Sequence, residues 1–169
     1  MPDTRIRSLF VIAVLAVATA CTSGGPDADA AMAASVTVED PWVRAAESGM
    51  TAVFGTLANT GGRPVRIVGA ESSSAARVEI HEIARGGSGG TTMRPKVGGI
   101  AIAPGHSHAL VPGGDHLMLM DLKVPLHPGG DVAVTVVFED GSALPVHAQI
   151  RDFAGGDEEY PGEQGHGHG

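Results

Sequence analysis

The stretch DVAVTVVFEDGSALPVHAQI (residues 131–150) holds two β-prone runs, Asp131–Glu139 and Ala143–Ile150, on either side of the turn signal Asp140-Gly141. Such a pair is typical of a β-hairpin. Similar runs, separated by Gly- and Pro-containing turn signals, fill the preceding part of the chain: Thr51–Ala58, Val65–Ala70, Ala76–Ala84, Thr91–Arg94, Gly99–Ala103, His108–Val111 and His116–Val124. No segment shows a helical repeat, and roughly eight or nine short strands at this spacing predict an all-β domain, an antiparallel sandwich or barrel.

Length and composition favour a single domain. The chain has 169 residues with 25 Gly, 11 Pro and only 4% aromatic residues, which suits one compact, turn-rich core. We place this domain at residues 36–153. Residues 21–35 show no hydrophobic periodicity, and residues 154–169 are Gly-rich, acidic and His-containing with no apolar face to bury. We expect a disordered N-terminal tether and a disordered C-terminal tail around the domain.

The first 20 residues are expected to form a signal peptide. Arg5 and Arg7 precede the apolar run Leu9–Ala20, which is shorter than the roughly 20 residues that a membrane-spanning helix needs. The sequence Ala18-Thr19-Ala20-Cys21 resembles a bacterial lipobox and contains the only cysteine of the chain. It predicts cleavage before Cys21, lipidation of the Cys21 thiol and anchoring to the outer face of the cell membrane.

The N-terminal segment leaves one alternative open and affects the net charge of the mature protein. A plain signal peptide cut near Ala31 or Ala34 is the alternative to the lipoprotein. Cleavage before Cys21 removes two arginines and one aspartate, so the formal charge changes from −8 to −9. Because an acidic surface offers no footprint for phosphate backbones, we expect no nucleic-acid partner.

The run His116-Leu117-Met118-Leu119-Met120 concentrates His and Met in one predicted strand. Side chains alternate between faces along a strand, so His116, Met118 and Met120 share one face while Leu117 and Leu119 take the other, which is the natural core face. His116 and Met118 would then lie roughly 7 Å apart at their Cα atoms, close enough to converge on one ion.

A second His and Met pair lies in a predicted hairpin. Residues 76–84 and 91–94 are joined through the Gly-rich stretch 86–90. If residues 86–88 form a three-residue turn, Arg85 pairs with Gly89 and His81 lies directly opposite Met93, with Cβ atoms about 5 Å apart. A register slip of one residue would place the two side chains on opposite faces.

Two imidazoles and two thioethers form a soft, uncharged ligand set, which favours Cu(I) over Mg²⁺, Ca²⁺ or Mn²⁺ and, by a smaller margin, over Zn²⁺. The alternative is that the methionines fill gaps in the core and that both histidines are ordinary surface or hydrogen-bonded residues. Taken one residue at a time, that alternative is the better interpretation.

The spacing of these residues resembles a known family, the periplasmic PCuAC copper chaperones, whose motif reads H(M)x10Mx21-22HxM. Here His81 is followed by Glu82 in place of the optional Met, then by ten residues and Met93, then by 22 residues and His116-Leu117-Met118. Other similar stretches extend the resemblance over roughly residues 36–150: Pro41-Trp42-Val43-Arg44-Ala45, Leu57-Ala58-Asn59-Thr60-Gly61, Val78-Glu79-Ile80-His81-Glu82, Met93-Arg94-Pro95, Pro112-Gly113-Gly114-Asp115-His116 and Val137-Phe138-Glu139-Asp140-Gly141.

The resemblance implies a cupredoxin-like sandwich that binds one Cu(I) through His81, Met93, His116 and Met118 and performs no catalysis. It also implies delivery of the ion to the binuclear copper centre of cytochrome c oxidase, in subunit II, directly or with a thioredoxin-like assembly factor. With Glu82 in place of the optional Met, Met120 is the nearest candidate for an auxiliary ligand.

Weaker metal candidates remain. His166 and His168 in the tail suit a loose Cu(II) site, because an unstructured chain lets two imidazoles wrap an ion, but they fit a solvating low-complexity segment equally well. His106 and His108 suit a minor Cu(II) or zinc site, although exposed loop histidines are the simpler interpretation. Trp42 is expected to be a core or rim anchor and not a ligand. A surface or hydrogen-bonded role is expected for His127 and His147.

Other functional classes fit the metal-binding residues of this chain less well. A blue copper electron-transfer site needs a Cys thiolate near the metal, and Cys21 is at the anchor. A Cu/Zn hydrolase or dismutase needs more clustered histidines and a carboxylate. The second hypothesis is therefore a surface-anchored β-sandwich lipoprotein with an adhesion or structural role and only incidental metal binding.

Overall fold

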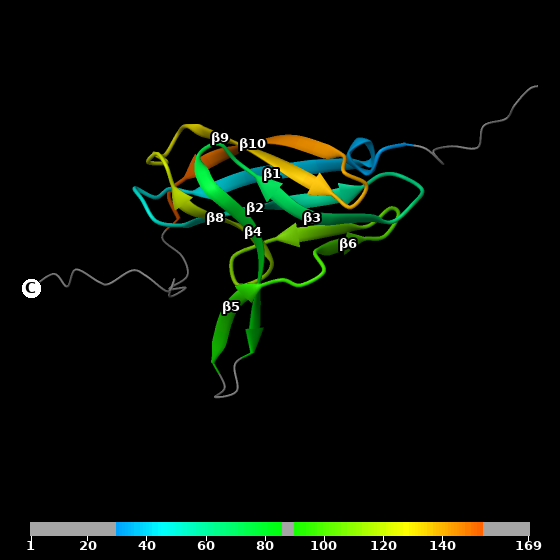
Figure 1. Cartoon of the computed structure of the whole chain (residues 1–169), viewed down its shortest axis with the longest axis horizontal. Helices are drawn as coiled ribbons and strands as arrows, with labels where there is room; N and C mark the ends of the chain where they lie inside the picture. Colours follow the sequence, from blue (N-terminus) through cyan, green and yellow to red (C-terminus); the bar gives the residue numbers. More distant parts are fainter. Residues whose placement is uncertain (1–29, 86–89, 154–169) are drawn as a thin grey trace, which may run out of the picture.

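The computed structural model describes residues 30–85 and 90–153, which form a barrel of short strands with one projecting hairpin (Figure 1). The elements in chain order are the 3₁₀ helix η1 (Met32–Ser35) and the strands β1 (Val36–Arg44), β2 (Thr51–Asn59), β3 (Val65–Glu71), β4 (Ala75–Arg85), β5 (Thr91–Pro95), β6 (Ile100–Ile102), β7 (Ser107–Leu110), β8 (His116–Leu122), β9 (Asp131–Phe138) and β10 (Ala143–Arg151). The predicted all-β class is confirmed, and the predicted runs agree with β2 to β10 within two residues at each end.

The strands form one sheet that closes on itself. The strand order is β5-β4-β8-β2-β1-β10-β9-β3-β6, and a short pairing between Ala70 of β3 and Val78 of β4 closes the barrel. The described strands pair antiparallel, as expected, except that β1 and β10 pair in parallel. These strands begin and end the domain, and no tight turn joins them to impose an antiparallel arrangement.

The sequence did not predict β1, because the dipeptide Asp40-Pro41 interrupts it. The backbone of Asp40 is left-handed (φ 44°), and the pairing with β2 shifts register between Glu39 and Trp42. Gly55 on β2 faces this bulge, and a Cβ there would come within 3.1 Å of the Pro41 Cα. The bulge therefore lets β1 continue to Trp42, which pairs with Phe54 beside the site described below.

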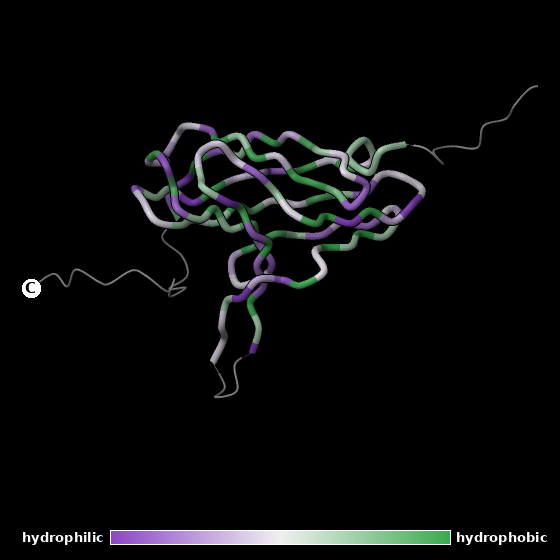
Figure 2. The backbone as a smooth tube through the Cα atoms, in the orientation of Figure 1, coloured by the Kyte–Doolittle hydropathy of each residue, from purple (hydrophilic) through white to green (hydrophobic). Residues whose placement is uncertain are grey.

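Both faces of β8 are buried. Leu117 and Leu119 lie in the main core, as expected from strand alternation. His116 and Met118 on the opposite face are equally inaccessible, at 0% exposure each. β8 lies between β4 and β2, and partially buried side chains cover its second face. Hydrophobic and hydrophilic residues alternate along much of the barrel, as Figure 2 shows.

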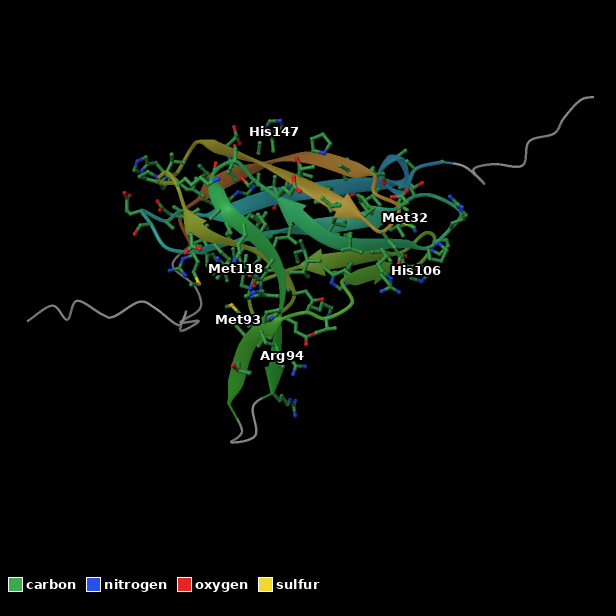
Figure 3. All side chains as sticks on the ribbon, in the orientation of Figure 1. Met32, Met93, Arg94, His106, Met118 and His147 are labelled. Carbon is green, nitrogen blue, oxygen red and sulfur yellow. The ribbon has the colours of Figure 1, made fainter. Side chains whose placement is uncertain are left out.

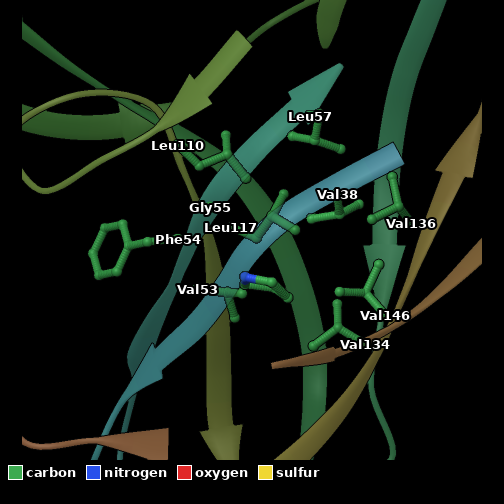
Figure 4. Close-up of a pocket in the computed structure, with 11 residues that line it drawn as sticks. Val38, Val53, Phe54, Gly55, Leu57, Leu110, Leu117, Val134, Val136 and Val146 are labelled. Carbon is green, nitrogen blue, oxygen red and sulfur yellow. The ribbon is translucent and has the colours of Figure 1, made fainter. Parts of the chain in front are cut away.

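An apolar cavity opens between the strands beside Gly55 and Leu117 (Figure 4). Its volume is about 20 Å³. A single water molecule needs about 10–15 Å³, so this cavity is too small for an organic ligand. It is a packing defect of the core and not a binding site.

One hairpin leaves the barrel. β5 and the end of β4 project from the body, and among the described strands β5 pairs only with β4 (Figure 1). We call residues 82–85 and 91–95 the arm. Residues 86–89 at its tip lie outside the described residues.

The folded part of the chain begins before β1. Residues 32–35, which the sequence analysis placed in the tether, form η1 instead. The Met32 amide donates to Asp140 Oδ2 (2.7 Å), and the Ala33 amide donates to Ser142 Oγ (3.0 Å). These hydrogen bonds fix the start of the barrel to the β9–β10 turn. Within the described residues, no helix is long and apolar enough to cross a membrane.

Asn59 should be the polar residue on which the fold depends most. It is 1% exposed, its Nδ2 donates to the carbonyl oxygens of Arg63 (2.8 Å) and Ile102 (3.0 Å), and its Oδ1 accepts from the Gly61 amide (3.0 Å). Asn59→Ala removes all three bonds and leaves buried partners unsatisfied, so we expect a loss of about 3 kcal/mol in unfolding free energy. Chemical denaturation measures it. Thr60→Ala, which removes one exposed bond, is the matched control and should cost under about 1 kcal/mol.

Candidate metal centre

Pairing between β4 and β8 brings the two predicted imidazole ligands together. His81 lies directly opposite His116, Glu79 opposite Met118 and Arg77 opposite Met120. Direct partners in an antiparallel pair project to the same face, so the two histidines and both β8 methionines share one side of the sheet. This site lies where the arm leaves the barrel.

The two imidazoles are buried and close. His81 is 8% exposed and His116 is fully buried, with ring centres 5.8 Å apart and planes inclined at 60°. A nitrogen about 2 Å from a metal ion places its ring centre roughly 3 Å from the ion, so two rings that share an ion have centres at most about 6 Å apart. The observed spacing is within that limit.

Each ring is held through one nitrogen. His116 Nδ1 lies 3.0 Å from the carbonyl oxygen of Gly114, and His81 Nε2 lies 2.9 Å from Glu79 Oε2. The hydrogen bond from His81, followed by that from Arg77, holds the pKa of Glu79 below its usual value. His81 Nδ1 is buried and has no hydrogen-bond partner among the described residues.

Methionines surround these rings. Ala52, Phe54 and Met118 form a small buried cluster that is separate from the main core, and further side chains pack against it: Trp42, Met50, Met93 and Met120. Figure 3 shows Met93 and Met118 near the base of the arm. We call these seven residues the methionine cluster. It brings both predicted sulfur ligands to the histidine face, and their role as ligands stays a prediction.

The register expected for the arm is wrong by two residues. Met93 lies opposite Ile83, and His81 lies opposite Pro95, because Arg85 pairs with Thr91 and not with Gly89. The connection is therefore residues 86–90 instead of a three-residue turn. A shift of two keeps every side chain on its face, so Met93 is a diagonal neighbour of His81, still within reach of a long side chain.

Glu82, at the position of the motif's optional Met, projects from the opposite face of β4. It accepts hydrogen bonds from Arg94 (2.9 Å) and Lys96 (3.0 Å), and Lys96 also contacts Asp115. The hydrogen bond from Lys96, followed by that from Arg94, lowers the pKa of Glu82. Glu82 therefore braces the base of the arm and lies outside the methionine cluster.

Aromatic rings cover the histidine face. Phe54 lies 6.1 Å from the His116 ring, Trp42 stacks on Phe54 at 4.6 Å, and Phe153 lies 5.3 Å from Trp42. Trp42 is thus a rim residue, as expected. Phe54, Met50 and Glu79 could not be identified as neighbours of the site from the sequence, because nothing in their spacing distinguishes them from other residues of a β-strand.

The weaker candidates lie elsewhere. His106 Nδ1 lies 2.9 Å from the Pro104 carbonyl oxygen and His108 Nε2 lies 2.9 Å from Asp115, so these histidines are not directed at one ion. His147 is exposed, and the exposed His127 lies 3.3 Å from Glu47. Across residues 30–85 and 90–153, no group of three or more His, Cys, Asp or Glu side chains could hold a metal. The other candidates lie outside the described residues: Cys21, His166 and His168.

Two nitrogens and two sulfurs on one sheet face form an uncharged donor set. Such a set suits a soft ion of low charge and offers little to hard cations, which prefer oxygen. The fold and site together define a PCuAC-type β-barrel domain with a buried His and Met centre.

Comparisons with known proteins agree with this class. A family model described as "Putative lipoprotein LpqE-like" matches residues 36–150. The "Putative lipoprotein Lxx21020" of Leifsonia xyli subsp. xyli is 41% identical over 160 residues, covering 93% of this chain and 96% of the relative. This chain therefore belongs to the LpqE-like family of lipoproteins.

Solved structures show the same fold. The copper-bound PCuAC domain from PmoF2 superimposes with a TM-score of 0.57 at 22% identity, covering 70% of this chain and 93% of that domain. The solution structure of CuI-DR1885 from Deinococcus radiodurans gives a TM-score of 0.50 at 32% identity, covering 68% of this chain and 78% of that protein. The predicted PCuAC resemblance is confirmed at the level of family and fold.

Proposed function

We propose that this protein is an extracytoplasmic carrier that binds one Cu(I) ion through His81, Met93, His116 and Met118 and passes it to an acceptor protein. The observation that carries the proposal is His81 Nδ1, a buried nitrogen without a hydrogen-bond partner among the described residues, beside His116 and the methionine cluster. An unsatisfied buried polar atom costs about 1–3 kcal/mol, and coordination of an ion removes that cost.

The donor set supports the choice of Cu(I). Thioether sulfur and neutral imidazole are soft or borderline ligands that need no negative charge to bind a monovalent ion. The names of two structural relatives, a copper-bound PmoF2 domain and CuI-DR1885, support copper as the cargo. The ligands stay uncharged throughout, and we assign the site no catalytic step.

The arm supports a role in transfer. Met93 lies on β5, whose only partner among the described strands is β4, whereas His116 and Met118 lie on a central strand of the barrel. Moving the arm would detach the sulfur of Met93 while His116 and Met118 stay on the barrel. An incoming thioether or thiolate of an acceptor can then take the vacated position before the ion leaves.

The destination follows from the family resemblance and the N-terminal sequence. We propose that a lipid on Cys21 holds the protein at the outer face of the cell membrane and that the acceptor is the binuclear copper centre of cytochrome c oxidase subunit II. Delivery would be direct or with a thioredoxin-like assembly factor. In the tail, His166 and His168 are proposed as a loose Cu(II) site, and Met120 as an auxiliary ligand in the barrel.

Anaerobic titration of the chain with Cu(I) against a chromophoric chelator tests the binding step. We expect one tightly bound equivalent, with affinity lowered about tenfold in Met93→Leu, because a half-buried sulfur on the arm contributes one of four bonds. The variant His166→Ala/His168→Ala is the control that separates the tail from the barrel and should retain the tight equivalent. Absence of a tight equivalent would favour the structural or adhesion role.

A further inference from the structure

A hydrogen-bonded chain of charged side chains from Asp121, Arg77 and Glu79 leads to His81. Arg77 Nε donates to Glu79 Oε1 (2.9 Å) and Arg77 Nη1 donates to Asp121 Oδ2 (2.7 Å), while the other carboxylate oxygen of Glu79 faces His81 Nε2 at 2.9 Å. The exposed Asp121 and Arg77 lead inward to Glu79, whose side chain is 33% exposed, and then to the buried ring. None of these three residues belongs to the proposed ligand set.

This arrangement determines which ring nitrogen carries the proton. An ionised carboxylate only accepts hydrogen bonds, so the nitrogen that faces it must be the N–H donor of a neutral imidazole. Glu79 also accepts a hydrogen bond from the Arg77 guanidinium at 2.9 Å, and this ion pair identifies it as a carboxylate. His81 therefore carries its proton on Nε2 and its lone pair on Nδ1, the atom that is buried without a hydrogen-bond partner among the described residues.

We propose that Glu79 is the positioning residue of the site and selects Nδ1 of His81 as the nitrogen that coordinates copper, while Arg77 and Asp121 hold Glu79 in place. The inference rests on the proposed function. Histidine ligands commonly donate their second N–H to a carboxylate or carbonyl, which fixes the tautomer and the ring orientation.

His116 has the opposite tautomer. Its Nδ1 faces the carbonyl oxygen of Gly114 at 3.0 Å, and a carbonyl also only accepts, so the lone pair of His116 is on Nε2. The centre thus coordinates through Nδ1 of one imidazole and Nε2 of the other. The two partners differ in charge: Gly114 offers a neutral dipole, whereas Glu79, Arg77 and Asp121 together carry a net charge of −1, which balances a monovalent ion near a buried site.

Long-range ¹H–¹⁵N NMR of the ¹⁵N-labelled chain, with and without Cu(I), tests the assignment, since Cu(I) is diamagnetic. At pH 7.5 we expect His81 to be the Nε2–H tautomer in both states, with the copper-induced ¹⁵N shift at Nδ1, and His116 to show its shift at Nε2. In Glu79→Gln, the side-chain amide can donate as well as accept, so the single tautomer should no longer be enforced. Cu(I) affinity should fall about 10- to 100-fold.

Glu82→Gln is the matched control, because Glu82 is the same residue type on the same strand but binds Arg94 and Lys96 on the opposite face. Its His81 signals and Cu(I) affinity should equal those of the parent. Cu(I) bound through Nε2 of His81, or equal losses in both variants, would overturn the inference and leave the proposed function intact. Failure of the parent chain to bind Cu(I) would overturn both.

Discussion

Replacing Met118 with leucine is expected to weaken Cu(I) binding by at least about 100-fold while the barrel stays folded. Loss of a residue that only orients a ligand costs about 10- to 100-fold in metal affinity. Removal of a fully buried ligand atom should cost at least the upper end of that range, more than the tenfold expected for the half-buried Met93 on the arm. Met118 is fully buried on a central strand, so water cannot readily take the position that its sulfur vacates. Leucine has nearly the same volume, which keeps the loss in unfolding free energy below about 1.5 kcal/mol.

Met32→Leu provides the control for this measurement. Met32 lies in η1, at a distance from the site, as Figure 3 shows. It makes the same chemical change at a comparable methionine without touching the methionine cluster. Chelator competition gives the affinity, and thermal unfolding monitors the fold. If Met118→Leu binds Cu(I) within threefold of the parent, sulfur at this position is not a ligand.

Substitution of Gly99 by alanine is expected to destabilise the barrel severely. Gly99 has φ +70°, and a Cβ there would lie 2.0 Å from the backbone oxygen of Ile67. Because that oxygen belongs to β3, relief of the overlap requires separating β3 from β6, where Ile67 pairs with Ile100. We expect a loss of about 4 kcal/mol or more, a large part of the 5–15 kcal/mol that stabilises a typical domain.

Gly98→Ala isolates the backbone effect. Gly98 also has positive φ (+83°), but a Cβ at this residue would meet nothing within 4 Å. This variant should lose only the roughly 1–2 kcal/mol that a left-handed alanine costs. Urea denaturation of both variants checks the comparison. Equal losses would show that the overlap with Ile67 is relieved easily and that our account of the loop is wrong.

Most strands could be predicted because Gly and Pro mark their ends. β9 and β10, for example, flank Asp140-Gly141, and the structure places a turn there with Gly141 at φ +79°. β1 could not be predicted in this way, because Asp40-Pro41 resembles a turn and is instead a bulge inside a strand. The bulge fits because Gly55 faces it without a side chain, and Gly55 is next to Pro41 only in the folded sheet.

The gathering of the candidate His and Met residues on one face could be predicted, but the strand register could not. Strand alternation placed His116 and Met118 on one face, yet it could not show that this face is also buried, since burial depends on β2 and β4 on either side of β8. A Gly-rich connection does not determine which of its residues form the turn. The expected register placed His81 opposite Met93, whereas the observed register differs by two residues. The family and fold read from the His and Met spacing are confirmed, whereas the four-ligand set and the acceptor stay predictions.

Glu79 shows a further limit of sequence reasoning. At the sequence level it is one polar residue of an alternating strand, two positions before His81. Its proposed positioning role depends on a hydrogen bond from Arg77, which in turn binds Asp121 near the end of β8. Because this hydrogen-bond chain joins two strands, the spacing of residues along either strand does not reveal it.

The attachment of η1 to the β9–β10 turn has a consequence for orientation at a bilayer. A lipidated N-terminus would reach the barrel at Met32, whereas Trp42 lies roughly 20 Å further along β1, beside the metal centre. A molecule tethered at that end would keep its His and Met centre on the far side of the barrel from the attachment point, accessible from the aqueous compartment. Soluble donors and the protruding domains of membrane enzymes could then meet it without competing with lipid headgroups.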